Sequence, residues 1–170
     1  EAGFYHIPFN AKDVCLRLLP MAGAHFATKN FMTTDLPERY HTSSPIVEQI
    51  KRYGKELDEM GVLPTPFPLQ EILSEKALRH LYRIYGITGA SYGNLSARED
   101  INALGPTTFW MTGRGIDKSN IQTVGEDVLL VKGFDMQSGT ALVSVPPGYN
   151  PKARVSVDAV EHSMIYSEFP

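Results

Sequence analysis

The sequence predicts a layered α+β or α/β fold in which helices pack against a sheet. Three observations lead to this prediction: amphipathic helical segments come first, three short strand-like segments follow, and a last helical segment ends the chain. The 170 residues are enough for a domain with its own core. Hydrophobic residues make up 42% and charged residues 21%, which is an ordinary globular balance.

The clearest helix signal lies just after residue 43. Ser44 is a good cap, Pro45 suits the first helical position, and apolar residues recur at helical spacing up to residue 57. Met60 and Gly61 predict the end of this helix. A second amphipathic helix is predicted over residues 69–85.

Three prolines between residues 64 and 68 lie between the two predicted helices. Proline fixes φ and lacks an amide donor, so this cluster predicts an extended connector. We therefore divide the chain into an N-terminal helical extension or arm, residues 1–67, and a domain, residues 68–170.

Strand and helix signals alternate in the second half. Residues 107–112, 128–131 and 141–145 are predicted to be strands, with a glycine turn at residues 113–118 after the first of them. Residues 156–167 have apolar positions at helical spacing and predict the last helix.

Charge and cysteine content exclude several classes of protein. The formal net charge of -3 gives no field for holding nucleic acid or anionic lipid. Cys15 is the single cysteine, so no intrachain disulfide forms, which fits a reducing cytoplasm, and a small core residue is the simpler interpretation of it. Residues 1–9 lack a secretory-signal pattern, and the apolar runs are far shorter than the ~20 residues of a membrane helix. We expect a cytoplasmic protein that binds neither nucleic acid nor membranes.

The first candidate binding segment runs from Tyr92 to Arg98. Glycine permits a close backbone approach, and the side chains of Asn94, Ser96 and Arg98 offer donors suited to an anion. An ordinary helix-to-strand turn explains the same residues.

The second candidate segment runs from Thr112 to Lys118. Gly113 and Gly115 flank Arg114 after a predicted strand, and such a turn exposes backbone N–H groups. Neither a P-loop nor a dinucleotide fingerprint is present. The alternative is a hairpin loop with solvated charges.

The third candidate segment is the last helix. Spacings of four and eight residues place Asp158, His162 and Tyr166 along one helical face. A helix N-terminus stabilises a carboxylate, and helix capping by Asp158 with an ordinary histidine behind it is the alternative. The five histidines show no metal-ligand spacing, so no metal-ligating residue is assigned within the chain.

Taken in order, these segments resemble the class II aldolase/adducin family over residues 69–170. The family has a Gly-Asn-[Ile/Val/Leu]-Ser-x-Arg motif, present here as Gly93 to Arg98, and a strand leading into Thr-x-x-Gly-[Ile/Val]-x-Lys, present as Thr112 to Lys118. A hydrophobic strand with acidic neighbours follows at residues 126–131. The family's helix with Glu, His, Tyr and Pro at four-residue steps then corresponds to Asp158, His162, Tyr166 and Pro170.

The resemblance implies a central, mostly antiparallel sheet flanked by helices, incomplete in its later strands. It implies that Gly93, Asn94, Arg114, Gly115 and Ser156 bind a substrate phosphate. It also implies that Asp158 is the catalytic acid/base beside a metal-bound enediolate. The substrate class is a small phosphorylated sugar or related hydroxy-carbonyl compound, and homotetramers are common in the family.

The resemblance also shows departures. The family usually has Glu where this chain has Asp158, a small residue where it has Val157, and often a small hydroxyl residue where it has Arg114. The divalent metal, usually zinc, is held by a His-x-His pair and a third His that are expected beyond Pro170. We expect a metal-dependent aldolase or epimerase in the complete protein; the alternatives are a non-catalytic adducin-like assembly module and a metabolite-binding module.

Overall fold

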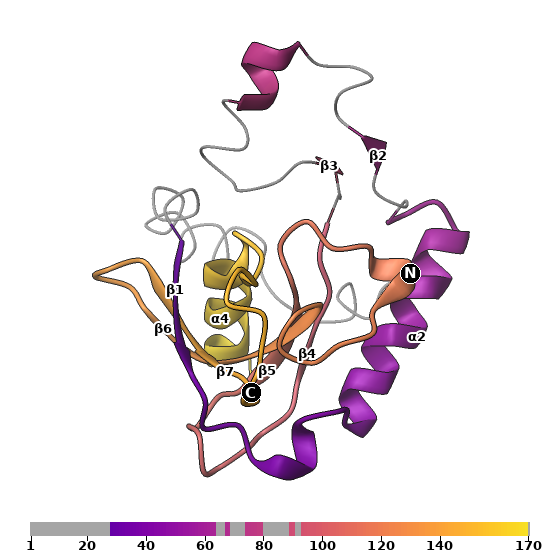
Figure 1. Cartoon of the computed structure of the whole chain (residues 1–170). Helices are drawn as coiled ribbons and strands as arrows, with labels where there is room; N and C mark the ends of the chain where they lie inside the picture. The colour runs from indigo at the N-terminus through magenta and orange to yellow at the C-terminus, as the bar shows by residue number, and fades with distance from the viewer. Residues whose placement is uncertain (1–27, 64–66, 69–73, 80–88, 91–92, 170) are drawn as a thin grey trace.

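The computed structural model describes residues 28–63, 67–68, 74–79, 89–90 and 93–169 (Figure 1). Its centre is a five-stranded sheet with the strand order β1-β7-β6-β5-β4. Every neighbouring pair is antiparallel except β1 and β7, which are parallel. The predicted fold class, a mostly antiparallel sheet with flanking helices, is confirmed. The strands are β1 (Lys29–Thr33), β4 (Ser96–Arg98), β5 (Phe109–Thr112), β6 (Val128–Asp135) and β7 (Thr140–Ser144).

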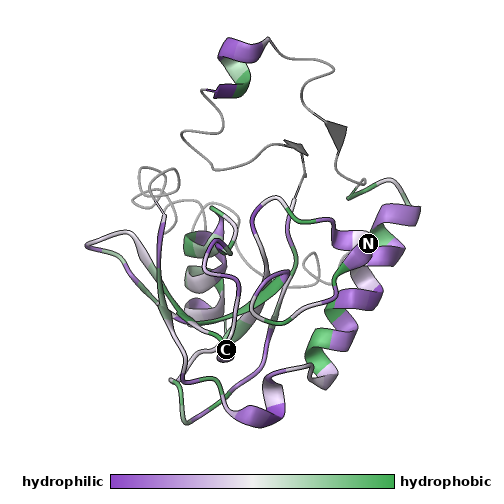
Figure 2. Ribbon diagram, in the orientation of Figure 1, coloured by the Kyte–Doolittle hydropathy of each residue, from purple (hydrophilic) through white to green (hydrophobic). Residues whose placement is uncertain are grey.

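The two long helices of the described chain are α2 (Pro45–Glu59) and α4 (Ala159–Glu168), and each covers one face of the sheet. Side chains alternate between the faces of a strand, so successive residues of β5 and β6 enter different cores. Trp110 and Leu130 pack with the buried residues of α2, whereas Phe109 and Leu129 pack with Ala159 at the start of α4. Figure 2 shows the hydrophobic strands in the middle and a mostly hydrophilic outer side of α2.

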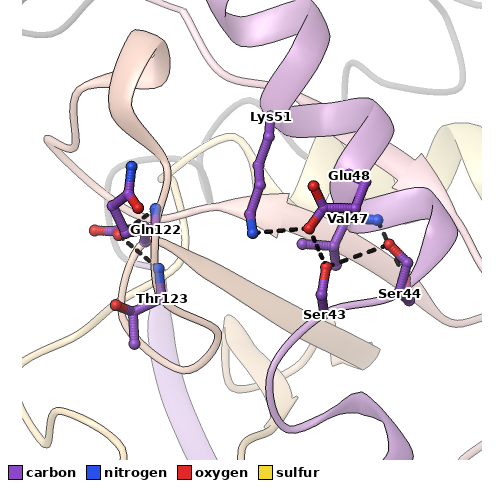
Figure 3. A network of polar contacts seen from close by, with 8 residues as sticks. Ser43, Ser44, Val47, Glu48, Lys51, Gln122 and Thr123 are labelled. Carbon is purple, nitrogen blue, oxygen red and sulfur yellow. Dashed lines mark hydrogen bonds and ion pairs between the residues drawn. The ribbon is translucent and has the colours of Figure 1, made fainter.

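The start of α2 has the cap that the sequence predicts. The Ser44 hydroxyl accepts a hydrogen bond from the Val47 amide at 3.1 Å, and proline occupies the first turn. Beside it, Ser43 donates to the carboxylate of Glu48 (Figure 3). The helix ends at Glu59, and Gly61 follows in the left-handed conformation, with φ +71°.

The capped end of α2 is also joined to the sheet. Ser44 Oγ donates to Glu99 Oε2 at 2.6 Å, and the indole Nε1 of Trp110 donates to the same oxygen at 2.6 Å. Ser44 is buried, so these donors satisfy a carboxylate oxygen in the interior.

Further along α2, Gly54 allows a close contact with a 3-10 helix, η6 (Lys118–Asn120). A Cβ atom at position 54 would lie 2.1 Å from the carbonyl oxygen of Lys118. Glycine therefore lets the helix approach the backbone of this turn, and the Lys118 carbonyl lies against α2.

Strand β1 was not predicted. It pairs in register with β7, from Lys29 opposite Thr140 to Thr33 opposite Ser144. Asp35 stabilises the end of β1. Its carboxylate accepts hydrogen bonds from Thr33 Oγ1 at 2.8 Å and from Ser144 Oγ at 2.6 Å, and forms an ion pair with Lys132. Partial burial raises the pKa of Asp35, but these hydrogen bonds and the charge of Lys132 lower it to about 2.

The three predicted strands and the first and last helices are present with shifted ends. For the helix predicted over residues 69–85, residues 75–79 are helical and most of the remainder lies outside the described residues. Two short strands, β2 (Phe67–Pro68) and β3 (Gly89–Ala90), pair antiparallel. The prolines at 64 and 66 also lie outside the described residues, and the division at this cluster stays a prediction. In the described ranges, no helix is long and apolar enough to cross a membrane.

Candidate functional site

Backbone contacts bring the three candidate segments together. Leu95 and Thr112 exchange hydrogen bonds: the Leu95 amide donates to Thr112 Oγ1 at 3.0 Å, and the Thr112 amide donates to the Leu95 carbonyl at 2.9 Å. Gly113 forms an antiparallel bridge with Val155. The glycine turn therefore lies beside both Asn94 and Ser156.

Asn94, Ser156 and Asp158 form one hydrogen-bonded group. The side-chain amide of Asn94 donates to Asp158 Oδ2 and lies 3.3 Å from Ser156 Oγ. Ser156 Oγ is 3.3 Å from Asp158 Oδ2 and 3.4 Å from the Asp158 amide nitrogen. Three of the six predicted site residues are thus in contact, although more than sixty residues separate Asn94 from the other two.

Asp158 stands at the N-cap position of α4, but its side chain makes no capping hydrogen bond to the helix. The carboxylate contacts Asn94 and Ser156 instead. The alternative interpretation, that this carboxylate serves as the side-chain cap, is wrong. The carboxylate is half-buried at the positive end of a helix, which stabilises its negative charge, and a carboxylate in such a position can take part in proton transfer.

The other three predicted residues lie in turns around this group. Gly93 and Gly115 are exposed and adopt φ +65° and +73°, conformations that favour glycine. The backbone amide of Arg114 donates to the Arg154 carbonyl at 2.7 Å, and the Arg114 guanidinium lies 3.5 Å from the Thr28 carbonyl. Burial lowers the pKa of Arg114, and the neighbouring charge of Arg154 lowers it further.

Lys118, at the end of the second candidate segment, is a buried cation that was not among the predicted site residues. Only 2% of its surface is exposed, which overturns the alternative of a loop with solvated charges at this residue. Burial lowers the pKa of Lys118 to about 8, while the charges of Asp117 and Asp158 raise it. A Gly-Ile-Asp-Lys turn carries no periodic signal of burial. The backbone of Lys118 packs against α2 at Gly54.

Behind Asp158, the face of α4 makes further polar contacts. His162 Nδ1 lies 2.6 Å from Ser96 Oγ, and the Tyr166 hydroxyl lies 2.8 Å from the same oxygen. Burial lowers the pKa of His162, against the effect of the Asp158 charge. Burial also raises the pKa of Tyr166, although the Ser96 hydrogen bond and the charge of Arg98 act the other way. The predicted alignment of Asp158, His162 and Tyr166 along one face is confirmed by these contacts.

The described residues do not by themselves suit a metal ion. No cluster of three or more His, Cys, Asp or Glu side chains occurs among them. Asp158 is surrounded by an amide, a hydroxyl and a buried ammonium group, which are hydrogen-bond donors or cations rather than metal ligands. The prediction of ligands beyond Pro170 stays a prediction.

The fold and the site define a class of protein. It is a mixed α/β domain in which an Asn-Ser-Asp group lies between a glycine turn and the N-terminus of a helix. Comparison with protein families gives the family: residues 75–170 match the model described as the class II aldolase and adducin N-terminal domain. The match covers more than half of the 170 residues, and the chain belongs to this family. No curated protein and no solved structure matched the chain.

Proposed function

We propose that this chain contributes the substrate-binding and proton-transfer residues of an aldolase- or epimerase-type enzyme. Its substrate would be a small phosphorylated sugar or a related hydroxy-carbonyl compound, and the reaction would pass through an enediolate. One observation carries the proposal: the Asp158 carboxylate is held by Asn94 and Ser156 where the family's motifs meet.

Each group has a role that its chemistry supports. Asp158 takes a proton from carbon next to the substrate carbonyl and returns it, as a carboxylate within reach of the substrate can do. Asn94 and Ser156 have N–H and O–H donors that suit phosphate oxygens. The exposed glycine turns at Gly93 and Gly115 add backbone groups that a side chain would otherwise cover, and Arg114 adds positive charge.

The buried Lys118 contributes to the electrostatics of the same group. Its charge acts on Asp158. The ammonium group therefore adds positive charge beside the residue to which we assign proton transfer. The family's divalent metal, zinc by resemblance, belongs to the proposal with ligands expected beyond Pro170, and a cytoplasmic homotetramer belongs to it as well.

A second candidate is a non-catalytic, adducin-like module that binds a metabolite or assembles with other chains. Two substitutions favour it: Asp158 is one methylene shorter than the usual Glu, and Val157 lacks the hydroxyl of the usual small residue. The enzyme requires proton transfer by Asp158, whereas the non-catalytic module does not.

The test combines binding and isotope exchange on the full chain. Isothermal titration with dihydroxyacetone phosphate, the smallest phosphorylated ketose, is run with and without zinc, and inorganic phosphate is the reference ligand. Loss of carbon-bound hydrogen to D₂O is followed by proton NMR. We expect Asn94→Ala to weaken binding about tenfold, since hydrogen bonds to a charged group contribute about 1.5 kcal/mol or more. The exposed Asn102→Ala is the matched control.

Asp158→Asn separates the two candidates. We expect it to keep most of the binding and to abolish exchange, because the amide cannot accept the proton. Binding without exchange in the zinc-loaded wild type supports the non-catalytic module. Absence of binding at millimolar ligand, with and without zinc, refutes both the enzyme and the metabolite-binding role.

A further inference from the structure

Two rows of polar residues face each other across the start of β4 and the helix α4. Asn94, Ser96 and Arg98 alternate along the strand direction, and Asp158 and Tyr166 are four residues before and after His162 on the helix. Each member of the first row contacts the second row. Two sequence motifs, more than sixty residues apart, are therefore complementary to each other.

The repeat lengths of a strand and a helix explain why the rows match. Two residues of a β-strand advance by about 6.7 Å. Four residues of an α-helix advance by about 6 Å. The mismatch is under about 1 Å per step, so three consecutive pairs stay within hydrogen-bonding reach without distortion of either element.

The middle of the row is a single hydroxyl with two partners. Ser96 Oγ lies 2.6 Å from His162 Nδ1 and 2.8 Å from the Tyr166 hydroxyl. A serine hydroxyl has one proton and two acceptor positions, so it can serve both neighbours at once. Removal of this oxygen breaks two contacts of α4 in one step.

The far end of the row is held by packing as well as by polar contacts. The Arg98 guanidinium donates to the Tyr166 carbonyl and lies 5.6 Å from the centre of the Tyr166 ring. The Phe109 ring is 4.9 Å from the same ring. Tyr166 thus contacts β4 through Arg98 and β5 through Phe109, and these contacts restrict the rotation of α4 about its axis.

We propose that Ser96 and His162 are positioning residues for Asp158, which hold the first turn of α4 in the rotation that presents the Asp158 carboxylate to the Asn94 amide. This inference rests on the proposed function for the role of Asp158, but the geometric part does not. The His162 imidazole contacts Ser96, and the His162 backbone amide donates to the Asp158 carbonyl at 3.1 Å, so His162 acts on the site through the helix. The charge of Asp158 also acts on His162, so changes at one are felt at the other.

The decisive variants are Ser96→Ala, which removes the shared hydroxyl, and Ser96→Thr, which restores a hydroxyl and suits a strand. Two NMR signals are read in the ligand-free full chain: the imidazole nitrogens of His162 and the side-chain amide of Asn94. We expect Ser96→Ala to shift both and to weaken dihydroxyacetone phosphate binding about fivefold, the effect of one ordinary hydrogen bond. Ser96→Thr should restore the amide signal and the affinity to within about twofold.

A purely local role predicts a different pattern. If Ser96→Ala shifts the His162 signals while the Asn94 amide and the affinity match the wild type, the positioning role is wrong. If the wild type binds no phosphorylated ligand, the proposed function fails, and the Asn94 signal alone still decides the positioning role.

Tyr166→Phe covers the case in which Ser96→Ala does not fold. It removes only the phenolic oxygen and keeps the ring between Phe109 and Arg98, as well as the backbone carbonyl that accepts from Arg98. We expect a smaller shift of the Asn94 amide in the same direction. An unchanged Asn94 amide in a folded Tyr166→Phe protein overturns the proposal.

Discussion

Replacement of Lys118 by Met tests whether the protein holds a buried positive charge at this position. The side chain is 2% exposed, and burial lowers its pKa from the ordinary 10.5 to about 8, with the charges of Asp117 and Asp158 opposing that change. Methionine has a similar length and no charge. The folded protein should therefore lose an electrostatic cost at neutral pH and keep most of the packing.

The magnitude follows from proton linkage. Between pH 8 and 10.5 the unfolded chain keeps a proton that the folded protein has lost at Lys118, so the wild type gains stability as the pH rises through this window. A tenfold change in proton affinity corresponds to ~1.4 kcal/mol, so the full effect is on the order of 3 kcal/mol. The advantage of Lys118→Met over the wild type should fall by about 2 to 3 kcal/mol between pH 7 and 10.

Urea unfolding of both proteins at several pH values measures this difference, and groups common to both cancel. Lys55→Met, at an exposed position of α2, removes the same charge and is the matched control. A difference that stays constant from pH 7 to 10 would refute the reasoning, because it would mean that Lys118 is hydrated in the folded protein. Asp158→Asn adds a second arm: it should lower the pKa of Lys118 further, as read from its Cε resonance, because one of the two charges that raise this pKa is removed.

Three further substitutions test the elements that frame the site, each by urea unfolding. Ser44→Ala should cost about 2 kcal/mol, since it removes a helix cap and a donor to a half-buried carboxylate, whereas Ser43→Ala next to it should cost under about 0.5 kcal/mol. Gly54→Ala should destabilise by about 2 kcal/mol despite the better helix propensity of alanine, because its Cβ would meet the backbone carbonyl of Lys118 at 2.1 Å; a stabilised variant would contradict that contact. Asp35→Asn should cost about 1 kcal/mol at pH 7 after allowance for solvent screening of a side chain that is 45% exposed. That cost should fade as the pH drops from about 4 to about 2, because the depressed pKa of Asp35 makes its contribution disappear on protonation; a cost that persists at pH 2 would exclude this cause.

The elements that the sequence predicted correctly carry local signals. Ser44 and Pro45 define the start of α2 within a few residues, and Gly61 defines its end by a conformation that glycine favours. The strands β5, β6 and β7 are rich in branched and aromatic residues that are buried on both faces of the sheet. Such signals are visible because each depends only on neighbouring residues.

Strand β1 has no such signal. Its sequence from Lys29 to Thr33 is largely polar, and its large apolar residue Phe31 is 59% exposed. What makes it a strand is a parallel pairing with β7, more than 100 residues away, together with the Asp35 contacts. Long-range pairing of this kind cannot be derived from local periodicity.

The candidate site also contains residues that local sequence signals predicted and residues that they did not. Spacing alone placed Asp158, His162 and Tyr166 on one face, because helical periodicity is local. The partners of that face came from the other end of the domain, and only the resemblance to the family linked Asn94 to Asp158. The burial of Lys118 had no signal at either level, because the burial of a residue in a turn depends on elements that are distant in the sequence.

The position of Asp158 distinguishes a stabilising residue from a functional one. An aspartate before the first turn of a helix usually accepts a backbone amide, and this cap stabilises a protein by about 1 kcal/mol. At α4 the capping bond is missing, and the carboxylate is turned toward the Asn94 amide and the Ser156 hydroxyl, with the Lys118 cation close enough to act on it. A residue selected for helix stability would take the cap. The Asp158 carboxylate does not form the cap and instead contacts an amide, a loop hydroxyl and a buried cation. This arrangement departs from the local preference of a helix N-terminus at the position where we propose proton transfer. Such departures from local preference concentrate at functional positions.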